Sequence, residues 1–179
     1  MQQSNIDYRL CFKQIDQDKL ERFLMTQKDE LFLPDRAAAK KIVDMVFENG
    51  GILGGFDSAN RIQAMFGFFF GDPGDGFADK DVLFIYVGAI SKSFRLSRTF
   101  LKGIASILKE GTRLKIDQFR MHASIHDPYL NRLYGKFSNP LGESQNIRGY
   151  PVMVYEGSVE DLFAKIGPSL KTVARDVSY

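Results

Sequence analysis

"DVLFIYVGAISKSFRLSRTFLKGIASILKE", residues 81–110, is the stretch of the sequence that decides the fold. Its first ten residues form a nearly continuous apolar run, which is typical of a strand buried on both faces in the middle of a sheet. A junction rich in cations and hydroxyl groups follows, and apolar residues then recur at helical spacing. The first-turn N–H groups of a helix are unpaired and its dipole is positive there, so such a junction is suited to bind phosphate. The alternative is the solvated start of a surface helix.

The bulk composition indicates one globular domain over residues 1–179. A hydrophobic content of 44% with 26% charged residues excludes a disordered chain. The net charge of +2 is too small to predict a nucleic-acid partner. No apolar run approaches the roughly 20 residues that span a bilayer, and no signal peptide is recognised, so no membrane span is expected. The single cysteine, Cys11, fits a reducing compartment, and we expect a cytoplasmic protein.

Elements expected on either side of this stretch alternate between strands and helices. They are a strand (6–15), helices starting at Asp16 and at Pro34-Asp35, a hairpin (50–70), the strand 81–90, the helix that ends before Gly111, a strand (113–125), a helix (127–137), a loop, a strand (149–156) and a helix from Ser158. This order predicts an α/β fold with a mixed sheet. The strand–helix–strand step over 82–125 should cross over right-handed and give a parallel pair.

Several kinds of active site are excluded by the motifs. His122 and His126 stand four apart, but they fall on a strand end and a loop, so no metal site is predicted. No nucleophile elbow of the G-x-S-x-G type and no P-loop occurs. The glycines of "GGILGG" precede a strand instead of opening a helix, and this excludes a dinucleotide-binding fingerprint.

The order of the elements, "LFIYVGAISKSFRLSRTFLKGIASIL" (83–108) and "DPYLNRLYGKFSNPLGE" (127–143) together resemble the GNAT superfamily of N-acetyltransferases. The resemblance implies a mixed, mostly antiparallel central sheet flanked by helices. It also implies an acyltransferase that moves an acyl group, acetyl or longer, from acyl-coenzyme A to an amine. In that family the central strand leads into a pyrophosphate loop of the form [QR]-x-x-G-x-[GA]. Arg95 matches the leading position, whereas Arg98 and Phe100 stand where the family has glycine and a small residue.

The resemblance also implies roles for particular residues. Tyr134 corresponds to the tyrosine that protonates the departing thiolate, although its helical phase also suits a core tyrosine. His126 and Asp81 are the candidates for the general base, beside a base relayed through water. A backbone N–H within 85–88 would hold the oxyanion. The residues expected to bind coenzyme A are Tyr86, Val87, Ser93, Arg95, Leu96, Ser97, Arg98, Thr99 and Phe100.

An aromatic strand gives an expectation about the acyl group. Phe66, Phe68 and Phe70 alternate along one strand and therefore share a face. In the family this strand borders the acyl and acceptor channel, so the three rings are predicted to bind substrate and favour a longer acyl chain. The alternative is ordinary core packing that leaves room only for acetyl.

Two other interpretations stay open. An acyl carrier protein could replace coenzyme A as the donor, because the basic cluster 92–102 suits an acidic partner. A catalytically silent acyl-coenzyme A-binding module would explain the missing loop glycines. The acceptor, a small amine or a peptide, and the choice between monomer and homodimer are not decided by the sequence.

Overall fold

The computed structural model of the chain describes residues 6–95 and 98–175. Its elements, in chain order, are β1 (Asp7–Leu10), α1 (Lys13–Thr26), α2 (Arg36–Asn49), β2 (Gly50–Phe56), β3 (Ile62–Phe70), the 3-10 turn η1 (Pro73–Asp75), β4 (Val82–Ile90), the 3-10 turn η2 (Lys92–Phe94), α3 (Thr99–Arg113), β5 (Gln118–Ser124), α4 (Pro128–Tyr134), β6 (Asn139–Gln145), β7 (Pro151–Ser158) and α5 (Val159–Arg175). Among the described residues, no helix is long and apolar enough to cross a membrane.

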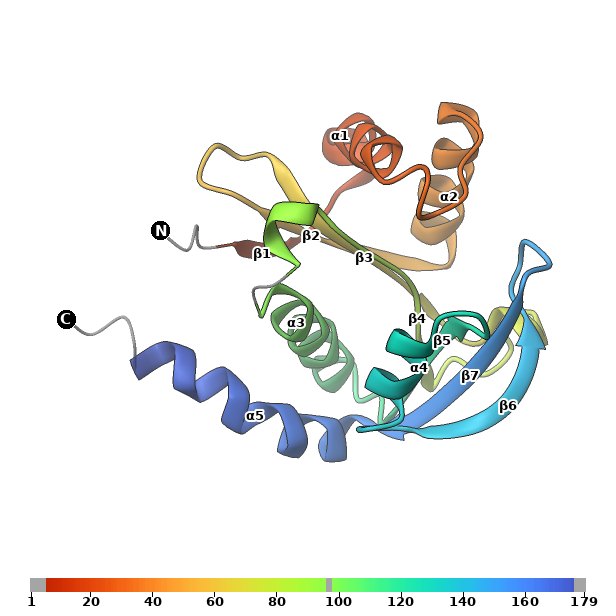
Figure 1. Cartoon of the computed structure of the whole chain (residues 1–179), viewed down its shortest axis with the longest axis vertical. Coiled ribbons are helices and arrows are strands. Elements are labelled where there is room, and N and C mark those ends of the chain that lie inside the picture. The colour runs from red at the N-terminus through yellow and green to blue at the C-terminus, as the bar shows by residue number, and fades with distance from the viewer. Residues whose placement is uncertain (1–5, 96–97, 176–179) are drawn as a thin grey trace. The chain divides into compact units, whose positions relative to one another are not determined.

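The sheet is mixed, as the sequence predicts. Within the described part of the chain, seven strands follow the order β1-β2-β3-β4-β5-β7-β6 (Figure 1). The pairs β1–β2, β5–β7 and β6–β7 are antiparallel. The strands β4 and β5 run parallel, with Val82 opposite Gln118. The expected parallel pair across the α3 crossover is therefore confirmed.

The chain divides into two compact units. Met1–Phe68 and Val87–Ile107 form the first unit, and Phe69–Tyr86 and Leu108–Tyr179 form the second. The strands β3 and β4 and the helix α3 contribute residues to both. The single domain that the sequence predicts stays a prediction.

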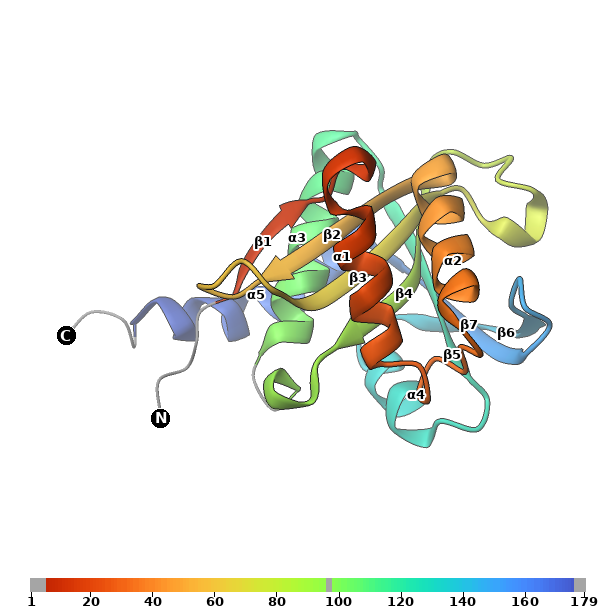
Figure 2. The ribbon, with the colours of Figure 1, turned by 90° about the horizontal axis from the view of Figure 1, so that it is seen from above.

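In the first unit, helices pack on both faces of β3. A Cβ at Gly67 would lie 3.2 Å from Val46, which belongs to α2. A Cβ at Gly103 of α3 would lie 2.2 Å from the ring of Phe66, so this position of α3 has no room for a side chain. Successive strand residues point to opposite faces, and Phe66 and Gly67 therefore carry α3 and α2 on the two faces. Figure 2 shows α1 and α2 side by side across β2 and β3.

The second unit has its own core. Phe119 of β5 is fully buried, and Gly157 on the facing strand β7 leaves room for its ring. On the other face, the ring of Phe69 lies 4.8 Å from that of Tyr86 and 6.4 Å from that of Phe84. This face of β4 and β5 carries the hollow that forms part of the candidate site.

The predicted starts of three helices are confirmed. Asp127 accepts a hydrogen bond from the N–H of Leu130 at 2.9 Å, with proline at the first position of α4. The hydroxyl of Ser158 accepts one from the N–H of Asp161 at 3.3 Å and begins α5. The side chain of Asp35 caps α2 in the same way. Each side-chain oxygen satisfies a first-turn N–H that has no partner within the helix.

The expected start of α1 at Asp16 is wrong. The helix begins at Lys13, and Asp16 lies one turn inside it. Its buried carboxylate accepts from the guanidinium of Arg9 at 2.9 and 3.0 Å and from the N–H of Phe12 at 3.0 Å. The hydrogen bond from Arg9 holds the pKa of Asp16 below its usual range. Asp16 therefore forms an ion pair with the preceding strand, β1, and is not the N-cap of the helix.

The segment 139–145, expected as a loop, forms strand β6. All its residues are exposed, and it pairs with β7 through a register shift between Pro140 and Gly142. Its sequence, "NPLGESQ", lacks the alternation that marks a half-buried strand. Backbone pairing holds β6 at the edge of the sheet and its side chains are not buried, so the hydrophobic pattern did not indicate a strand.

Candidate functional site

The junction between β4 and α3, in the first unit, holds most of the predicted coenzyme A residues. Ser91 fixes its start, because its hydroxyl donates to the side-chain oxygen of Gln63 at 2.7 Å and its N–H donates to the carbonyl of Gln63 at 2.9 Å. The turn η2 follows, and the side chains of Ser93 and Arg98 are exposed. Leu96 and Ser97 lie outside the described residues. The junction thus presents hydroxyl groups and cations at the start of a long helix.

Arg95 makes a network of hydrogen bonds instead of projecting into solvent alone. Its Nε donates to the carbonyl of Ile90 at 2.9 Å. Its terminal nitrogens donate to the carboxylate of Glu30 at 2.8 and 2.6 Å and to the side chain of Gln27 at 2.8 Å. Any phosphate bound by Arg95 must therefore compete with Glu30.

Thr99 and Phe100 anchor the first turn of α3. The carbonyl of Thr99 accepts from the hydroxyl of Tyr8 at 2.7 Å. The ring of Phe100 lies 6.0 Å from that of Phe66. Burial raises the pKa of Tyr8, which therefore stays a donor. The backbone at the start of α3 is held from β1 and β3, so its N–H groups are preorganised.

The aromatic residues predicted to bind substrate are mostly core. Phe66 is fully buried and packs between Tyr8 and Phe100, with ring centroids 6.2 and 6.0 Å away. Phe68 is buried beside Gly51. Phe70 is half-buried at the end of β3, in the second unit. The structure thus brings together Phe66 and Phe100 among the predicted residues.

The two predicted residues of β4 also face packed surroundings. The side chain of Val87 lies against Gly67 in the first unit. The side chain of Tyr86 is buried in the second unit, and its ring lies 5.7 Å from that of His122.

Tyr134 lies at the end of α4, in the second unit, and is buried. Its ring packs edge-on against Tyr155, with centroids 5.8 Å apart. Burial, and to a lesser degree the nearby Asp127, raises its pKa well above the usual value. The phenol is therefore protonated over the physiological range and can act as a hydrogen-bond donor.

The two candidate bases lie at the surface of the second unit. His126 is exposed in the turn before α4, where its N–H donates to the hydroxyl of Ser124 at 3.2 Å. Asp81 is exposed just before β4, and its N–H donates to the carboxylate of Asp79 at 3.1 Å. Their role as bases stays a prediction. Neither of them lines the hollow of this unit.

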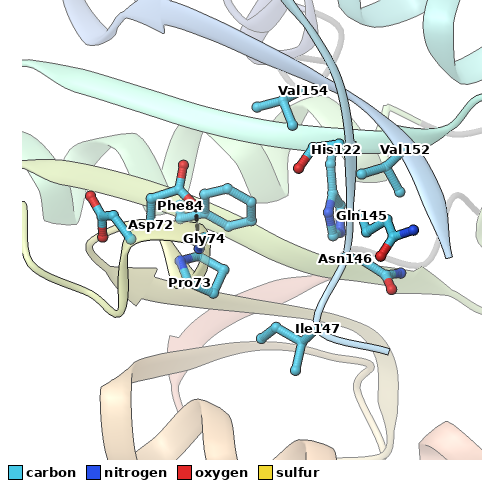
Figure 3. A pocket seen from close by; sticks show the side chains of 12 residues that line it. Asp72, Pro73, Gly74, Phe84, His122, Gln145, Asn146, Ile147, Val152 and Val154 are labelled. Carbon is cyan, nitrogen blue, oxygen red and sulfur yellow. Dashed lines mark hydrogen bonds between the residues drawn. The ribbon is translucent and has the colours of Figure 1, made fainter. Parts of the chain in front are cut away.

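A hollow of about 450 Å³ lies on the sheet face of the second unit (Figure 3). Side chains of β4, β5 and β7 form its floor, the turn η1 one wall, and the segment that joins β6 to β7 another. Its lining residues are Asp72, Pro73, Gly74, Asp75, Phe84, His122, Ser144, Gln145, Asn146, Ile147, Val152 and Val154. The volume lies within the roughly 300–1,000 Å³ of small-molecule sites.

His122 is the titratable residue at the floor of the hollow. Its Nε2 lies 3.0 Å from the carbonyl oxygen of Tyr86, and its ring meets that of Phe84 edge-on at 5.5 Å. Burial lowers the pKa of His122 below its usual value. Sequence reasoning considered this histidine only for a metal site. Within the described residues, no three histidine, cysteine or carboxylate side chains gather as a metal site.

A signal for His122 was present in the strand pattern. Phe119, Met121 and Ala123 are buried on one face of β5, which puts Arg120 and His122 on the other face. Two polar residues side by side on the inner part of a sheet point to a polar site instead of core. Arg120 indeed forms ion pairs with Asp72 at 2.9 Å and with Glu156 at 2.7 Å.

Comparisons with known proteins support the fold. No protein-family model and no curated protein sequence matches the chain. Solved structures do match, and one is a protein from Desulfovibrio desulfuricans assigned to the GNAT family of acetyltransferases, with a TM-score of 0.68 and 13% identity over 87% of this chain and 99% of that one.

Two further matches carry more specific names. An acetyltransferase from Bacillus subtilis, solved in complex with coenzyme A, has a TM-score of 0.63 and 14% identity over 86% of this chain and 99% of that one. A ribosomal-protein-S5-alanine acetyltransferase from Vibrio fischeri has a TM-score of 0.66 and 7% identity over 90% of this chain and 97% of that one. The chain therefore has the fold of the GNAT acetyltransferases.

Proposed function

We propose that the chain is an N-acyltransferase that moves an acetyl group from acetyl-coenzyme A to an amine. The observation that carries this proposal is the basic, hydroxyl-bearing junction that directly follows the central strand β4 of a GNAT fold and opens the helix α3. In α/β sheets, ligands gather at the carboxyl ends of such strands. The complex of the Bacillus subtilis neighbour with coenzyme A supports the same donor here.

The pyrophosphate of the donor would bind to the junction over residues 93–100. First-turn N–H groups of α3 and the guanidinium of Arg98 supply positive charge there. A side chain at 98 hinders the close backbone approach that glycine permits, so Arg98 replaces some backbone contacts with a bidentate one. Backbone groups of Tyr86 and Val87 would face the pantetheine and the thioester.

Transfer to an ammonium requires two protons to leave the nitrogen. One is removed by a base, and the neutral amine attacks the thioester carbon. The C–N bond forms, the C–S bond breaks, and the second proton follows to the sulfur. The hydroxyl of Tyr134 would donate a hydrogen bond to the sulfur as the thiolate develops. Because the pKa of Tyr134 is raised, this hydrogen bond is favoured over complete transfer of the proton. His126 and Asp81 would reach the ammonium directly or through water.

The packing of the aromatic strand supports acetyl over a longer acyl group. Phe66 and Phe68 are buried against neighbouring residues, which is the alternative of ordinary core packing. Comparing kcat/KM along a series from acetyl- to palmitoyl-coenzyme A tests this choice. A rate that increases with chain length, at about 0.8 kcal/mol per buried methylene, would contradict it.

Two observations favour a second candidate, a module that binds acyl-coenzyme A without catalysis. Arg95 is paired with Glu30, and Arg98 and Phe100 replace the loop glycines. Two measurements separate the candidates. A thermal shift with coenzyme A reports binding, and release of free thiol from acetyl-coenzyme A in the presence of primary amines reports transfer. Binding without thiol release for any amine would select the silent module, and thiol release only from an acylated carrier protein would change the donor.

The proposal also includes the compartment, which we take to be the cytoplasm, and the acceptor, which is an amine of a small molecule or a peptide. Cys11 is buried and unpaired, which supports a cytoplasmic location.

A further inference from the structure

The hollow of the second unit has a chemistry that the proposed function leaves unused. Its floor combines the imidazole of His122 with the apolar side chains of Phe84, Val152 and Val154. Its rim carries the carboxylates of Asp72, just before the turn η1, and of Asp75, within that turn. Figure 3 shows His122 and Phe84 side by side, with Asp72, Pro73 and Gly74 on the other side of Phe84.

The hydrogen bond of His122 fixes which ring nitrogen can accept a proton. The carbonyl of Tyr86 only accepts, so Nε2 of His122 must carry the hydrogen in the 3.0 Å contact. In the neutral ring Nδ1 then has a lone pair. Among the described residues, none donates a hydrogen bond to Nδ1. Burial disfavours the charged ring, so His122 is present as a neutral base near pH 7.

An ion-pair cluster lies on the same face of β5 as His122. Arg120, two residues before His122, pairs with Asp72 from the loop before η1 and with Glu156 of β7. Arg148, in the turn before β7, acts on the neighbouring Tyr86. Asp72 is the charged group with a resolved effect on the ring, and it raises the pKa of His122 against the larger effect of burial.

The rim carries a carboxylate with no cation beside it. Asp72 is already used, because Arg120 lies at 2.9 Å and the N–H of Gly74 donates to it at 2.7 Å. Asp75 accepts only the N–H of Ala78, at 3.0 Å, and within the described residues no lysine or arginine pairs with it. A carboxylate that paired with the reacting ammonium would oppose its deprotonation. Asp75 is better matched to a second, unreacting cation.

We propose that this hollow is the acceptor site and that it takes a small primary amine bearing a second positive charge. In place of His126 and Asp81, which do not line the hollow, Nδ1 of His122 accepts the proton of the reacting ammonium. The proposal rests on the proposed acyl transfer and names its substrate class. The ammonium gives one proton to Nδ1, and the imidazolium later releases it to water. The other cation stays charged beside Asp75. Apolar side chains of the floor suit the methylenes that join the two nitrogens.

The variant His122→Gln tests the base. The side-chain amide of glutamine can keep a donor near the Tyr86 carbonyl but offers no basic nitrogen. With acetyl-coenzyme A and butane-1,4-diamine at pH 7, we expect kcat/KM to fall by about 100-fold or more. The deficit should shrink towards pH 10, where an alkyl amine loses its proton unaided. Equal kcat/KM values and pH profiles for His122→Gln and wild type would overturn the proposal.

The variant Asp75→Asn tests the second cation. It should raise KM for butane-1,4-diamine several-fold and leave KM for butylamine, which has one charge, unchanged. Asp79→Asn removes the same charge from the same loop outside the hollow and is the control. An equal effect of Asp75→Asn on both amines, or acetylation of peptide amino termini in preference to the diamine, would contradict a site for a small dication.

A binding experiment separates this proposal from the proposed function. The chain has two histidines, so imidazole NMR signals can be assigned with His126→Gln alone. Titration with butane-1,4-diamine should shift the signal of His122 and not that of His126, whether or not any acyl transfer occurs. If thiol is released but the His122 signal does not shift, the acceptor site is wrong and the proposed acyl transfer stands. If the His122 signal shifts but no amine leads to thiol release, the diamine site stands and the proposed acyl transfer is wrong.

Discussion

The junction of the first unit and the hollow of the second present opposite charges. The junction gathers exposed cations at the start of α3 and holds one of them, Arg95, in an ion pair with Glu30. The hollow holds a half-buried histidine, whose pKa is lowered by burial, with carboxylates at the rim. The first arrangement suits an anion that arrives charged and stays charged. The second suits a cation that must lose a proton, in keeping with the donor and acceptor sites that we propose.

The largest expected effect concerns the cores beneath the two regions. Phe66 and Phe119 are each fully buried, one in either unit. Replacing either with alanine should lower the free energy of unfolding by about 3–5 kcal/mol, because the cavity left behind adds to the lost burial. Denaturant unfolding measures it. If the chain is one domain, both variants should still unfold in a single transition, and two separate transitions would break the domain prediction.

The next effect is on donor affinity at the junction. Arg98→Ala should weaken coenzyme A binding by about 1.5–3 kcal/mol, the contribution of a charged hydrogen bond. Arg95→Ala should weaken coenzyme A binding by a smaller amount, because phosphate must displace Glu30 to reach Arg95. Calorimetry measures both, with the acetyl thioester of N-acetylcysteamine, which lacks the pyrophosphate, as the control ligand. An unchanged affinity in the double variant would remove the junction from the donor site.

A smaller and kinetically distinct effect is expected at Tyr134. Tyr134→Phe removes a hydroxyl that is needed only while charge develops on sulfur, so kcat should fall by roughly 10-fold or more with little change in donor affinity. Steady-state rates and a coenzyme A binding curve on the same variant measure the two quantities. Full activity of the variant would mean that Tyr134 is a core residue packed on Tyr155. Its helical phase in the sequence also allows this role.

What the sequence predicts well is what hydrophobic period and capping chemistry encode. The strand β4, the helix α3 and the Asp127-Pro128 start of α4 are examples, because burial and the first-turn N–H groups constrain those residues locally. The edge strand β6 was missed since backbone pairing alone holds it. The start of α1 was misplaced because Asp16 serves an ion pair with Arg9, a tertiary contact that spacing does not reveal.

The candidate site shows the same division. Its junction follows from one contiguous stretch of sequence, whereas the hollow draws on residues from β4, β5, the turn η1 and the segment before β7. The tautomer of His122 depends on the carbonyl of Tyr86, 36 residues away, so no local pattern could announce it as a base. The ion pair between Arg95 and Glu30 joins residues that are even farther apart, 65 positions along the chain.

The smallest effect is expected when the ion pair between Arg95 and Glu30 is removed. Glu30→Gln removes a negative charge that both neutralises Arg95 and repels the donor's phosphates, so coenzyme A should bind more tightly. Exposed ion pairs contribute about 0.2–1 kcal/mol, which limits the gain to roughly fivefold. Asp29→Asn removes the same charge one residue away and has no contact with Arg95, so it is the matched control. High salt should abolish the difference between the two variants. Weaker binding of coenzyme A to Glu30→Gln would mean that the ion pair holds the junction in its binding conformation, and Glu30 would then support the donor site instead of competing with it.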